Sequence, residues 1–170
     1  MVNYDMKRLI LLLLLLFLAS CNNDDKIVKS RESEYLTDFT INTTRKGHKE
    51  WTLLAEKAIQ SPGDSMIVIF NFNLTFFKQD SFDSYLKADS GLFYPDRGDL
   101  YAYKNVFVLT KDSVELRTDS LFWNNSEKVL HAPGEILLKQ SGMLLKGKDL
   151  TSRSDLKEIV IKNVEGREKI

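Results

Sequence analysis

The segment "FNFNLTF", residues 70–76, decides the fold class, because it alternates apolar and polar side chains without a break. Its three phenylalanines and its leucine occupy the even positions, and Asn71, Asn73 and Thr75 occupy the odd ones. Successive side chains of a β-strand point to opposite faces, so this pattern predicts a strand with one buried face. We expect the four apolar residues to share that face.

The same alternation continues on both sides of this segment, from Tyr35 to the end of the chain. It is clear at residues 51–55 and 114–116 and weaker at 159–161. Residues 54–60 favour helix by composition, but the run is too short to stand alone, and we predict a strand there. Turn chemistry predicts breaks at 46–47, 61–64, 94–99, 111–112, 124–126, 132–134 and 141–142. The pattern predicts an all-β fold, a single elongated antiparallel β-jelly roll.

The composition of the N-terminus predicts an export signal. Lys7 and Arg8 precede ten apolar residues, 9–18, whereas a membrane-spanning helix needs about 20. A basic flank, a short apolar run and small residues after it are typical of a secretory signal. A buried core helix is the alternative, and either Met1 or Met6 can be the true start.

The sequence Leu18-Ala19-Ser20-Cys21 resembles the bacterial lipobox. That resemblance implies cleavage before Cys21 and addition of lipid, including palmitate, to the new N-terminal cysteine, which anchors the protein. The alternative is an ordinary signal peptide cut near Ala19. We predict a signal peptide over 1–20, a polar lipid-anchored tether over 21–34 and a β-jelly roll over 35–170.

Composition excludes several classes of function. Lys plus Arg and Asp plus Glu number 24 each, which argues against binding of nucleic acid. With one cysteine, no internal disulfide is possible. His48 and His131 have no partner at metal-ligand spacing, and the glycine patterns of nucleotide-binding loops are absent from the sequence. We therefore expect no catalytic residue, no metal and no cofactor, hence no enzyme.

Three regions of the body stand out as motifs: W-x-L-x-A-x-x-A at 51–58, the "ADSG" segment at 88–91, and a C-terminal series at 106–108, 116–123 and 142–150. In this order they resemble the LptC/OstA-type family of lipopolysaccharide transport proteins. By this resemblance Gly91, Gly142 and Gly147 are turn glycines. The chain departs from the family in Lys148-Asp149, where a second glycine is frequent.

The resemblance implies a function in outer-membrane biogenesis. The protein would receive lipopolysaccharide from the inner-membrane ABC transporter LptB/LptF/LptG and pass it to LptA through a hydrophobic groove between two sheets. The first strand, about 35–43, would meet LptF/LptG, and the last, about 156–164, would meet LptA. It would work in the periplasm of a Gram-negative bacterium, held in the inner membrane by lipidated Cys21 where many relatives use a transmembrane helix.

Bulky apolar residues in the inward rows are the candidates for contact with the acyl chains of lipid A. Each of them equally suits ordinary core packing. The alternative function is therefore a structural or adhesive β-sandwich lipoprotein with a dry core and no lipid cargo. The groove candidates are Trp51, Leu53, Phe72, Leu74, Phe76, Val106, Val108, Leu116, Leu121, Trp123, Ile136, Leu138 and Leu145.

Overall fold

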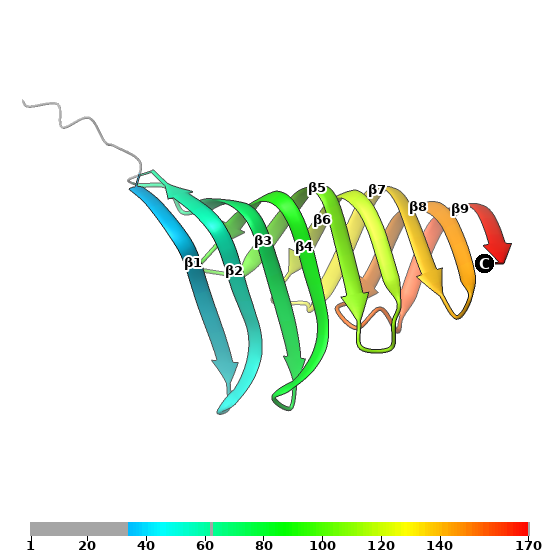
Figure 1. Ribbon diagram of the computed structural model, residues 1–170, viewed down its shortest axis with the longest axis horizontal. Helices are drawn as coiled ribbons and strands as arrows, with labels where there is room; N and C mark the ends of the chain where they lie inside the picture. Colours follow the sequence, from blue (N-terminus) through cyan, green and yellow to red (C-terminus); the bar gives the residue numbers. More distant parts are fainter. Residues whose placement is uncertain (1–33, 62, 170) are drawn as a thin grey trace, which may run out of the picture. The chain divides into compact units, whose positions relative to one another are not determined.

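The computed structural model describes residues 34–61 and 63–169, and these form nine strands in a single antiparallel sheet (Figure 1). Each strand pairs with its neighbours in sequence, in the order β1 to β9. The strands are β1 Glu34–Arg45, β2 His48–Gln60, β3 Ile67–Lys78, β4 Ser81–Tyr94, β5 Asp99–Thr110, β6 Glu115–Asn124, β7 Val129–Gln140, β8 Met143–Arg153 and β9 Ile159–Lys169. The predicted all-β fold is confirmed, and the segment that favours helix is part of β2. The lipobox and Cys21 lie outside the described residues.

Each strand curves over near its middle, so the sheet faces itself as two walls (Figure 1). The first wall ends at the turns β1–β2, β3–β4, β5–β6 and β7–β8, and the second wall ends at the four other turns. One long side of the roll is therefore a bend, where the strands cross from wall to wall. We call the opposite long side, where the turns of the two walls meet, the seam.

The bend is built by backbone conformations that interrupt the regular pairing. Asp38, Asn71, Asn105 and Asp149 have positive φ in mid-strand, and Asn and Asp tolerate this region better than most residues. The pairing between β4 and β5 is also irregular at the bend, where the register shifts between Lys87 and Ser90. Such irregularities let a flat sheet turn a corner.

Crossing the bend changes which residues of a strand face inward. In β3, Ile69 is fully buried before the bend and Phe72 after it, a separation of three residues. Phe70 is therefore on the outer face, and the prediction that it shares a face with Phe72 is wrong. The positive φ of Asn71, 47°, shifts the phase of the alternation at that point.

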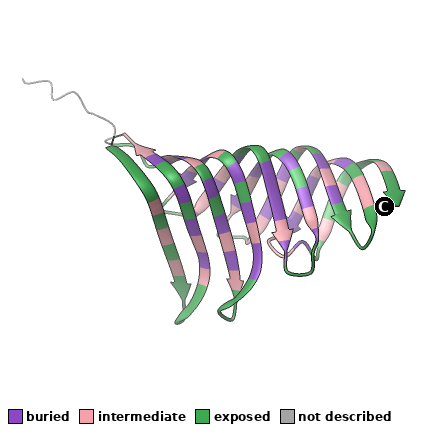
Figure 2. Cartoon of the chain, viewed as in Figure 1, coloured by how far each residue is buried: buried purple, intermediate pink, exposed green. Residues whose placement is uncertain are grey.

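The hydrophobic core fills the space between the two walls. Buried residues alternate with exposed ones along nearly every strand (Figure 2). The fully buried side chains come from both walls, from Leu53 and Leu86 on the first and from Leu100 and Leu130 on the second. In the part of the chain that the structure describes, there is no helix long and apolar enough to cross a membrane.

Several local predictions are wrong. The predicted turn at 132–134 lies inside β7, at the bend, and a turn at Gln79-Asp80 was not predicted. Gly142 lies in the β7–β8 turn, but Gly91 and Gly147 are strand residues rather than turn residues. At Gly91 a Cβ atom would lie 2.6 Å from the carbonyl oxygen of Tyr101, so close packing at the bend requires glycine there.

The two outer strands of the sheet each have one unpaired edge among the described strands. At the N-terminal end this is β1, close to the predicted strand 35–43. At the C-terminal end it is β9, which begins at Ile159, later than the predicted 156. Leu156 lies instead in the preceding turn, with a φ of 50°, and its side chain is fully buried.

Candidate functional site

The interior of the roll contains all the predicted groove residues. Twelve of the thirteen are buried, and Leu145 is half-buried and packs against the same cluster. The first wall contributes Trp51, Leu53, Phe72, Leu74, Phe76, Val106, Val108, Leu116, Ile136, Leu138 and Leu145, and the second wall contributes Leu121 and Trp123. The structure thus brings them together as two apolar surfaces that face each other.

Aromatic side chains join the two walls next to the seam. Phe76 meets Trp123 edge to face, with ring centroids 4.6 Å apart, and Trp51 meets Phe93 in the same way at 5.9 Å. Each pair has one ring on each wall. Such contacts contribute about 0.5–1.5 kcal/mol beyond the burial of area, and they hold the walls together without any backbone hydrogen bond.

A polar cluster closes the seam above these rings. Trp51 Nε1 donates a hydrogen bond to Asn125 Oδ1 at 3.3 Å. Lys128 Nζ lies 2.8 Å from Glu50 Oε1 and also 2.8 Å from Asn125 Oδ1. The Asn125 side chain donates to the carbonyl of Arg97, and its backbone N–H donates to Asp99. We call Glu50, Trp51, Asn125 and Lys128 the latch.

A second contact crosses the seam between the β5–β6 and β8–β9 turns. Lys157 Nζ lies 3.8 Å from Asp112 Oδ2, and both side chains are more than half exposed. The neighbouring Leu156 is buried in the core cluster, which also includes Val114 of the β5–β6 turn. This closure depends mainly on an apolar side chain from a loop, because an exposed ion pair contributes little.

A hollow of about 330 Å³ lies at the seam and combines an apolar floor with a charged rim. Trp51, Phe76 and Trp123 line its floor. The rim carries four cationic side chains, those of Arg45, Lys78, Lys128 and Arg153, and three acidic ones, those of Glu50, Asp83 and Asp155. The rim is therefore of mixed charge, and two of its cations, Arg45 and Lys128, are paired with Glu50.

Polar atoms are also buried close to this hollow. Among the described residues Asp83 Oδ1, Ser84 Oγ, Trp123 Nε1 and Ser152 Oγ have no hydrogen-bond partner, and Asp83 and Trp123 line the hollow. Buried polar groups normally have one, and leaving a group unpaired costs about 1–3 kcal/mol. The interior is thus apolar in its deep part and polar in places near the seam.

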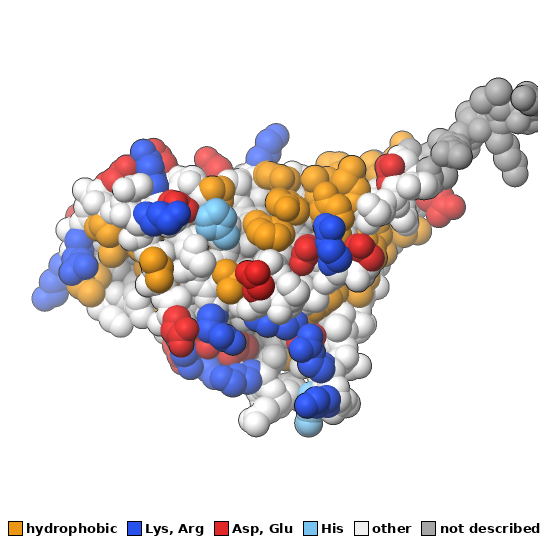
Figure 3. Space-filling view, turned by 180° about the vertical axis from the view of Figure 1, so that it is seen from behind, with side chains coloured by type: hydrophobic (Ala, Val, Ile, Leu, Met, Phe, Trp, Pro, Cys, Tyr) orange, Lys and Arg blue, Asp and Glu red, His pale blue; other side chains and the backbone are white. Residues whose placement is uncertain are grey.

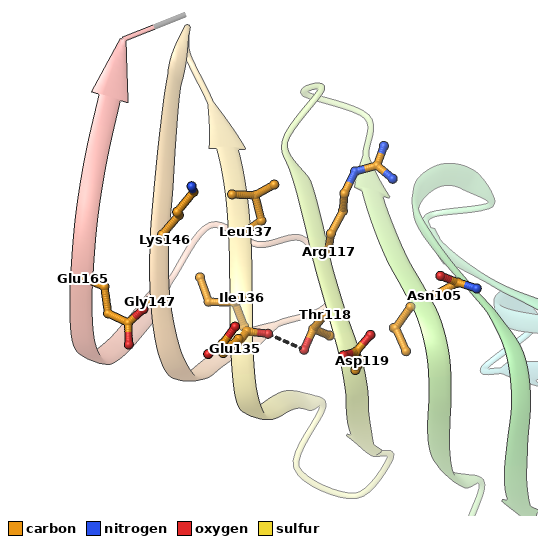
Figure 4. A pocket seen from close by; sticks show the side chains of 11 residues that line it. Asn105, Arg117, Thr118, Asp119, Glu135, Ile136, Leu137, Lys146, Gly147 and Glu165 are labelled. Atoms are coloured by element: carbon orange, nitrogen blue, oxygen red, sulfur yellow. Dashed lines mark hydrogen bonds between the residues drawn. The ribbon is translucent and has the colours of Figure 1, made fainter.

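A larger hollow, about 430 Å³, lies on the bend and is lined mostly by polar and charged side chains (Figure 4). Its lining includes Arg117, Asp119 and Lys146, and Thr118 Oγ1 donates to the carbonyl of Glu135 across the gap between β6 and β7. Val106 and Ile136 are the predicted groove residues that it reaches. It has no aromatic floor, so it is a weaker candidate for acyl chains than the seam hollow.

Both histidines are paired with single carboxylates. His48 Nδ1 lies 2.6 Å from Asp80 Oδ2, and the pKa of Asp80 is lowered, chiefly by that hydrogen bond. His131 Nε2 lies 2.9 Å from Asp149 Oδ1, whose pKa is lowered first by Lys162 and then by His131. Within residues 34–61 and 63–169, no group of three or more His, Cys, Asp or Glu residues is placed to hold a metal ion.

Comparison with known proteins decides the family. A family model described as "Lipopolysaccharide-assembly, LptC-related" matches residues 8–168, nearly the whole chain. The chain belongs to the LptC-related family. Membership implies a part in lipopolysaccharide transport, without enzymatic activity, in the periplasm and at the inner membrane of a Gram-negative cell. Membership also implies lipopolysaccharide and Lpt proteins as partners. The comparison with curated proteins found no match.

The latch is the part of the site that sequence reasoning missed. Asn125 was predicted only as a turn residue, and Glu50 and Lys128 are separated by 78 positions. No local pattern connects them, since they meet only when the bend brings the walls together. Trp51 is the exception, because the family motif at 51–58 already singles it out.

Proposed function

We propose that this LptC-related protein receives the acyl chains of lipopolysaccharide between its two walls, and that they enter through the seam. The seam hollow supports this most directly, because its aromatic lining continues into the apolar rows and its rim carries four cationic and three acidic side chains. The phosphorylated, sugar-bearing end of the molecule would stay at the rim while the chains lie inside.

The energetics suit transfer rather than storage. Each buried methylene contributes about 0.8 kcal/mol, whether the chain is buried in a bilayer or in a protein groove. Moving a chain from the membrane into the roll therefore changes the free energy little. The direction of transport must come from elsewhere, and we assign it to the ATP-driven transporter LptB/LptF/LptG.

The open edges of the sheet supply the contacts with neighbouring proteins. Exposed edge strands accept further strands by backbone hydrogen bonding. We propose that β1 meets LptF/LptG and that β9 passes the lipid on to LptA. A continuous sheet across these junctions would align the interior of one roll with that of the next.

We also propose that Cys21 is lipidated and that the acyl chains hold the protein in the inner membrane. The lipobox resemblance at 18–21 supports this. Labelling cells with a palmitate analogue would test it. Label should enter the wild-type protein and be lost in Cys21→Ser, and equal label in both would refute the lipoprotein assignment.

Photo-crosslinking in cells tests the transport role. A photoreactive residue in place of Phe72, which is buried in the first wall, should capture lipopolysaccharide. The matched control is Leu54, which lies on the outer face of β2 and is 47% exposed. Equal capture at both positions, or no capture at Phe72 in a folded protein, would contradict the proposal.

The second candidate function is a structural or adhesive lipoprotein whose interior stays dry. The close packing of the present core favours it, since residues such as Leu53 and Val108 are fully buried without a ligand. A protein of this kind would bind neither lipid nor other rolls. Pull-down with LptA separates the two, because only the transport protein should retain LptA.

A further inference from the structure

The outer face of the second wall carries an apolar surface that the transport role does not use. Hydrophobic side chains gather there (Figure 3). We call it the aromatic face. Its residues, all half-buried or exposed, are Ile59, Val68, Phe70, Leu92, Tyr94, Tyr101, Tyr103 and Phe122.

Strand register makes this face a continuous row rather than scattered residues. Five strands in succession contribute directly paired positions, with no charged side chain among them. The row runs Ile59, Val68, Leu92, Tyr101 and Phe122, and then reaches His131 on β7. Tyr101 stacks on Phe122 with ring centroids 4.4 Å apart, and Tyr94 meets Tyr101 edge to face at 5.9 Å.

The outer face of the first wall carries a smaller aromatic group, in which Tyr85 meets Phe82 at 6.5 Å and Phe107 at 5.9 Å between ring centroids. Its corresponding row begins at Leu54 and continues through Asn73, Lys87, Phe107 and Arg117. Cationic side chains interrupt it, and two of them cover its aromatic ring: Lys87 Nζ and Arg117 Cζ lie 5.4 and 4.6 Å from the centroid of Phe107. A row of apolar positions that continues across five strands without a charged side chain is thus found on the second wall and not in the corresponding row of the first.

We propose that the aromatic face docks on the surface of the membrane that holds the protein, at the level of the lipid headgroups. Tyrosine suits that depth, because its ring is apolar and its hydroxyl stays in contact with water. Three tyrosines lie on the face, and Tyr103 is 39% exposed.

Charge on the same wall favours an anionic lipid surface as the occupant. Lys57 Nζ lies 4.9 Å from the ring centroid of Tyr35, and Arg97 Cζ lies 4.5 Å from that of Tyr94. These two cations are attached to the second wall itself. Arg97 also pairs with Asp99 at 3.1 Å, so its contribution is smaller than that of Lys57. Cations beside an apolar face strengthen binding to anionic lipids.

The place where the described chain begins allows this face to reach a bilayer. Glu34 starts β1 on the second wall, and the next residue, Tyr35, pairs with Ile59 of the apolar row. Thirteen positions separate Cys21 from Glu34, and such a segment spans at most about 45 Å. This step rests on the proposed lipid anchor, which keeps Glu34, beside the β2 end of the face, within that distance of the membrane.

Docking of the aromatic face on the membrane and transport of lipopolysaccharide through the seam would use different residues. The aromatic face points away from the interior, and the seam and the unpaired edges of β1 and β9 remain free of it. A roll lying on the membrane would be held ready for the transporter before it joins the transport complex.

The test uses the full-length chain in a Gram-negative host, with a photoreactive residue in place of Tyr103. We expect phospholipid adducts, identified by mass spectrometry, at about tenfold higher yield than from the same residue at the outward control position Leu54. Tyr101→Ser should lower the yield at Tyr103 while lipopolysaccharide capture at Phe72 is unchanged.

Several results would contradict the docking proposal and leave the transport proposal unaffected. Protein adducts at Tyr103 would mean that the face binds a protein, and lipopolysaccharide adducts would make it part of the transport route. An adduct yield equal to that at Leu54 would mean that no surface docks there. Palmitate labelling of Cys21 and capture at Phe72 are read in the same cells, so failure of the anchor or of transport is distinguished from failure of docking.

Discussion

The bend and the seam are the two long sides of the same roll, and they are held by different forces. At the bend, the strands themselves cross from wall to wall, and side chains tie neighbouring strands together. Asn71 Nδ2 donates to Glu56 Oε2, and Asn105 Nδ2 donates to Asp89 Oδ2, both at 2.7 Å. At the seam, the contacts that join the walls are made by side chains such as Trp51 and Lys128.

This difference indicates which side can open. Opening the bend would break covalent continuity or many backbone hydrogen bonds. Opening the seam leaves the backbone ladders intact. It separates the polar contacts of the latch, each worth about 1 kcal/mol, and the buried ring pairs Phe76–Trp123 and Trp51–Phe93. Separating the rings costs more, unless acyl chains take their place against the exposed apolar surface. We infer that the bend stays closed and that lipid enters through the seam.

The largest effect on this comparison is expected from Trp51→Ala, which removes the ring that the latch shares with the core. Trp51 is 4% exposed, and a buried tryptophan truncated to alanine costs about 3–5 kcal/mol. Urea unfolding should show this loss. Leu54→Ala, on the outer face of the same strand, is the control and should change stability by less than about 1 kcal/mol. Similar losses for both variants would contradict the assignment of inner and outer faces.

The bend is tested next by Gly91→Ala. A Cβ atom at Gly91 would lie 2.6 Å from the carbonyl oxygen of Tyr101 and 2.8 Å from the ring of Phe72. Overpacking of this kind costs about 1–3 kcal/mol. The matched control is Gly166→Ala on β9, where a Cβ atom meets nothing within 4 Å. Thermal unfolding would measure both, and an unchanged midpoint for Gly91→Ala would show that the bend is more adaptable than its geometry indicates.

Much of this architecture could be predicted, because strands and turns are specified by residues that are neighbours in the sequence. Alternation along residues 70–76 and Gly-containing turns such as 46–47 specify strands and reversals from neighbouring residues alone. The inward positions Phe72, Leu74 and Phe76 follow from the same pattern. The family motif at 51–58 added the identity of the fold.

The bend was not predictable, because nothing local distinguishes it from a turn or from regular strand. The pair Pro133-Gly134 is typical of a turn, yet β7 continues through it. Gly91 and Gly147 read as turn glycines, whereas each is needed where two backbones come close. The latch joins Glu50 to Lys128 across the whole roll, so its existence depends on the bend and was equally hidden.

A smaller effect on stability, but a distinct effect on function, is expected from Lys128→Gln. Lys128 loses both its ion pair with Glu50, whose side chains are about one-quarter exposed or less, and its bond to Asn125, so the cost should be about 1–2 kcal/mol. The seam should then open more often, and a fluorescent lipid A analogue should bind at a higher rate in stopped-flow measurements. Lys139→Gln, which removes a longer and more exposed ion pair with Glu115 far from the latch, is the control. A rate unchanged in Lys128→Gln would show that the latch does not limit entry.

The smallest effect is expected from acidification at the bend. The pKa of Asp149 is lowered in the fold by Lys162 and then His131, so the carboxylate stabilises the folded state when charged. That contribution is present above the ordinary pKa of 3.8 and is lost as the pH falls through the lowered value. Asp149→Asn should therefore lose less stability on acidification below about pH 4 than the wild type. Asp96→Asn, in the β4–β5 turn, is the control, and parallel pH profiles for wild type and Asp149→Asn would contradict the prediction.

Locking the seam tests the central claim most directly. Cysteines in place of Glu50 and Lys128 would be joined by a short bis-maleimide in cells that carry the photoreactive residue at Phe72. The two single-cysteine variants control for Cys21, the one native cysteine. We predict that the joined protein stays folded and loses lipopolysaccharide capture at Phe72, whereas both single-cysteine variants keep it. Undiminished capture in the joined protein would show that acyl chains do not enter through the seam.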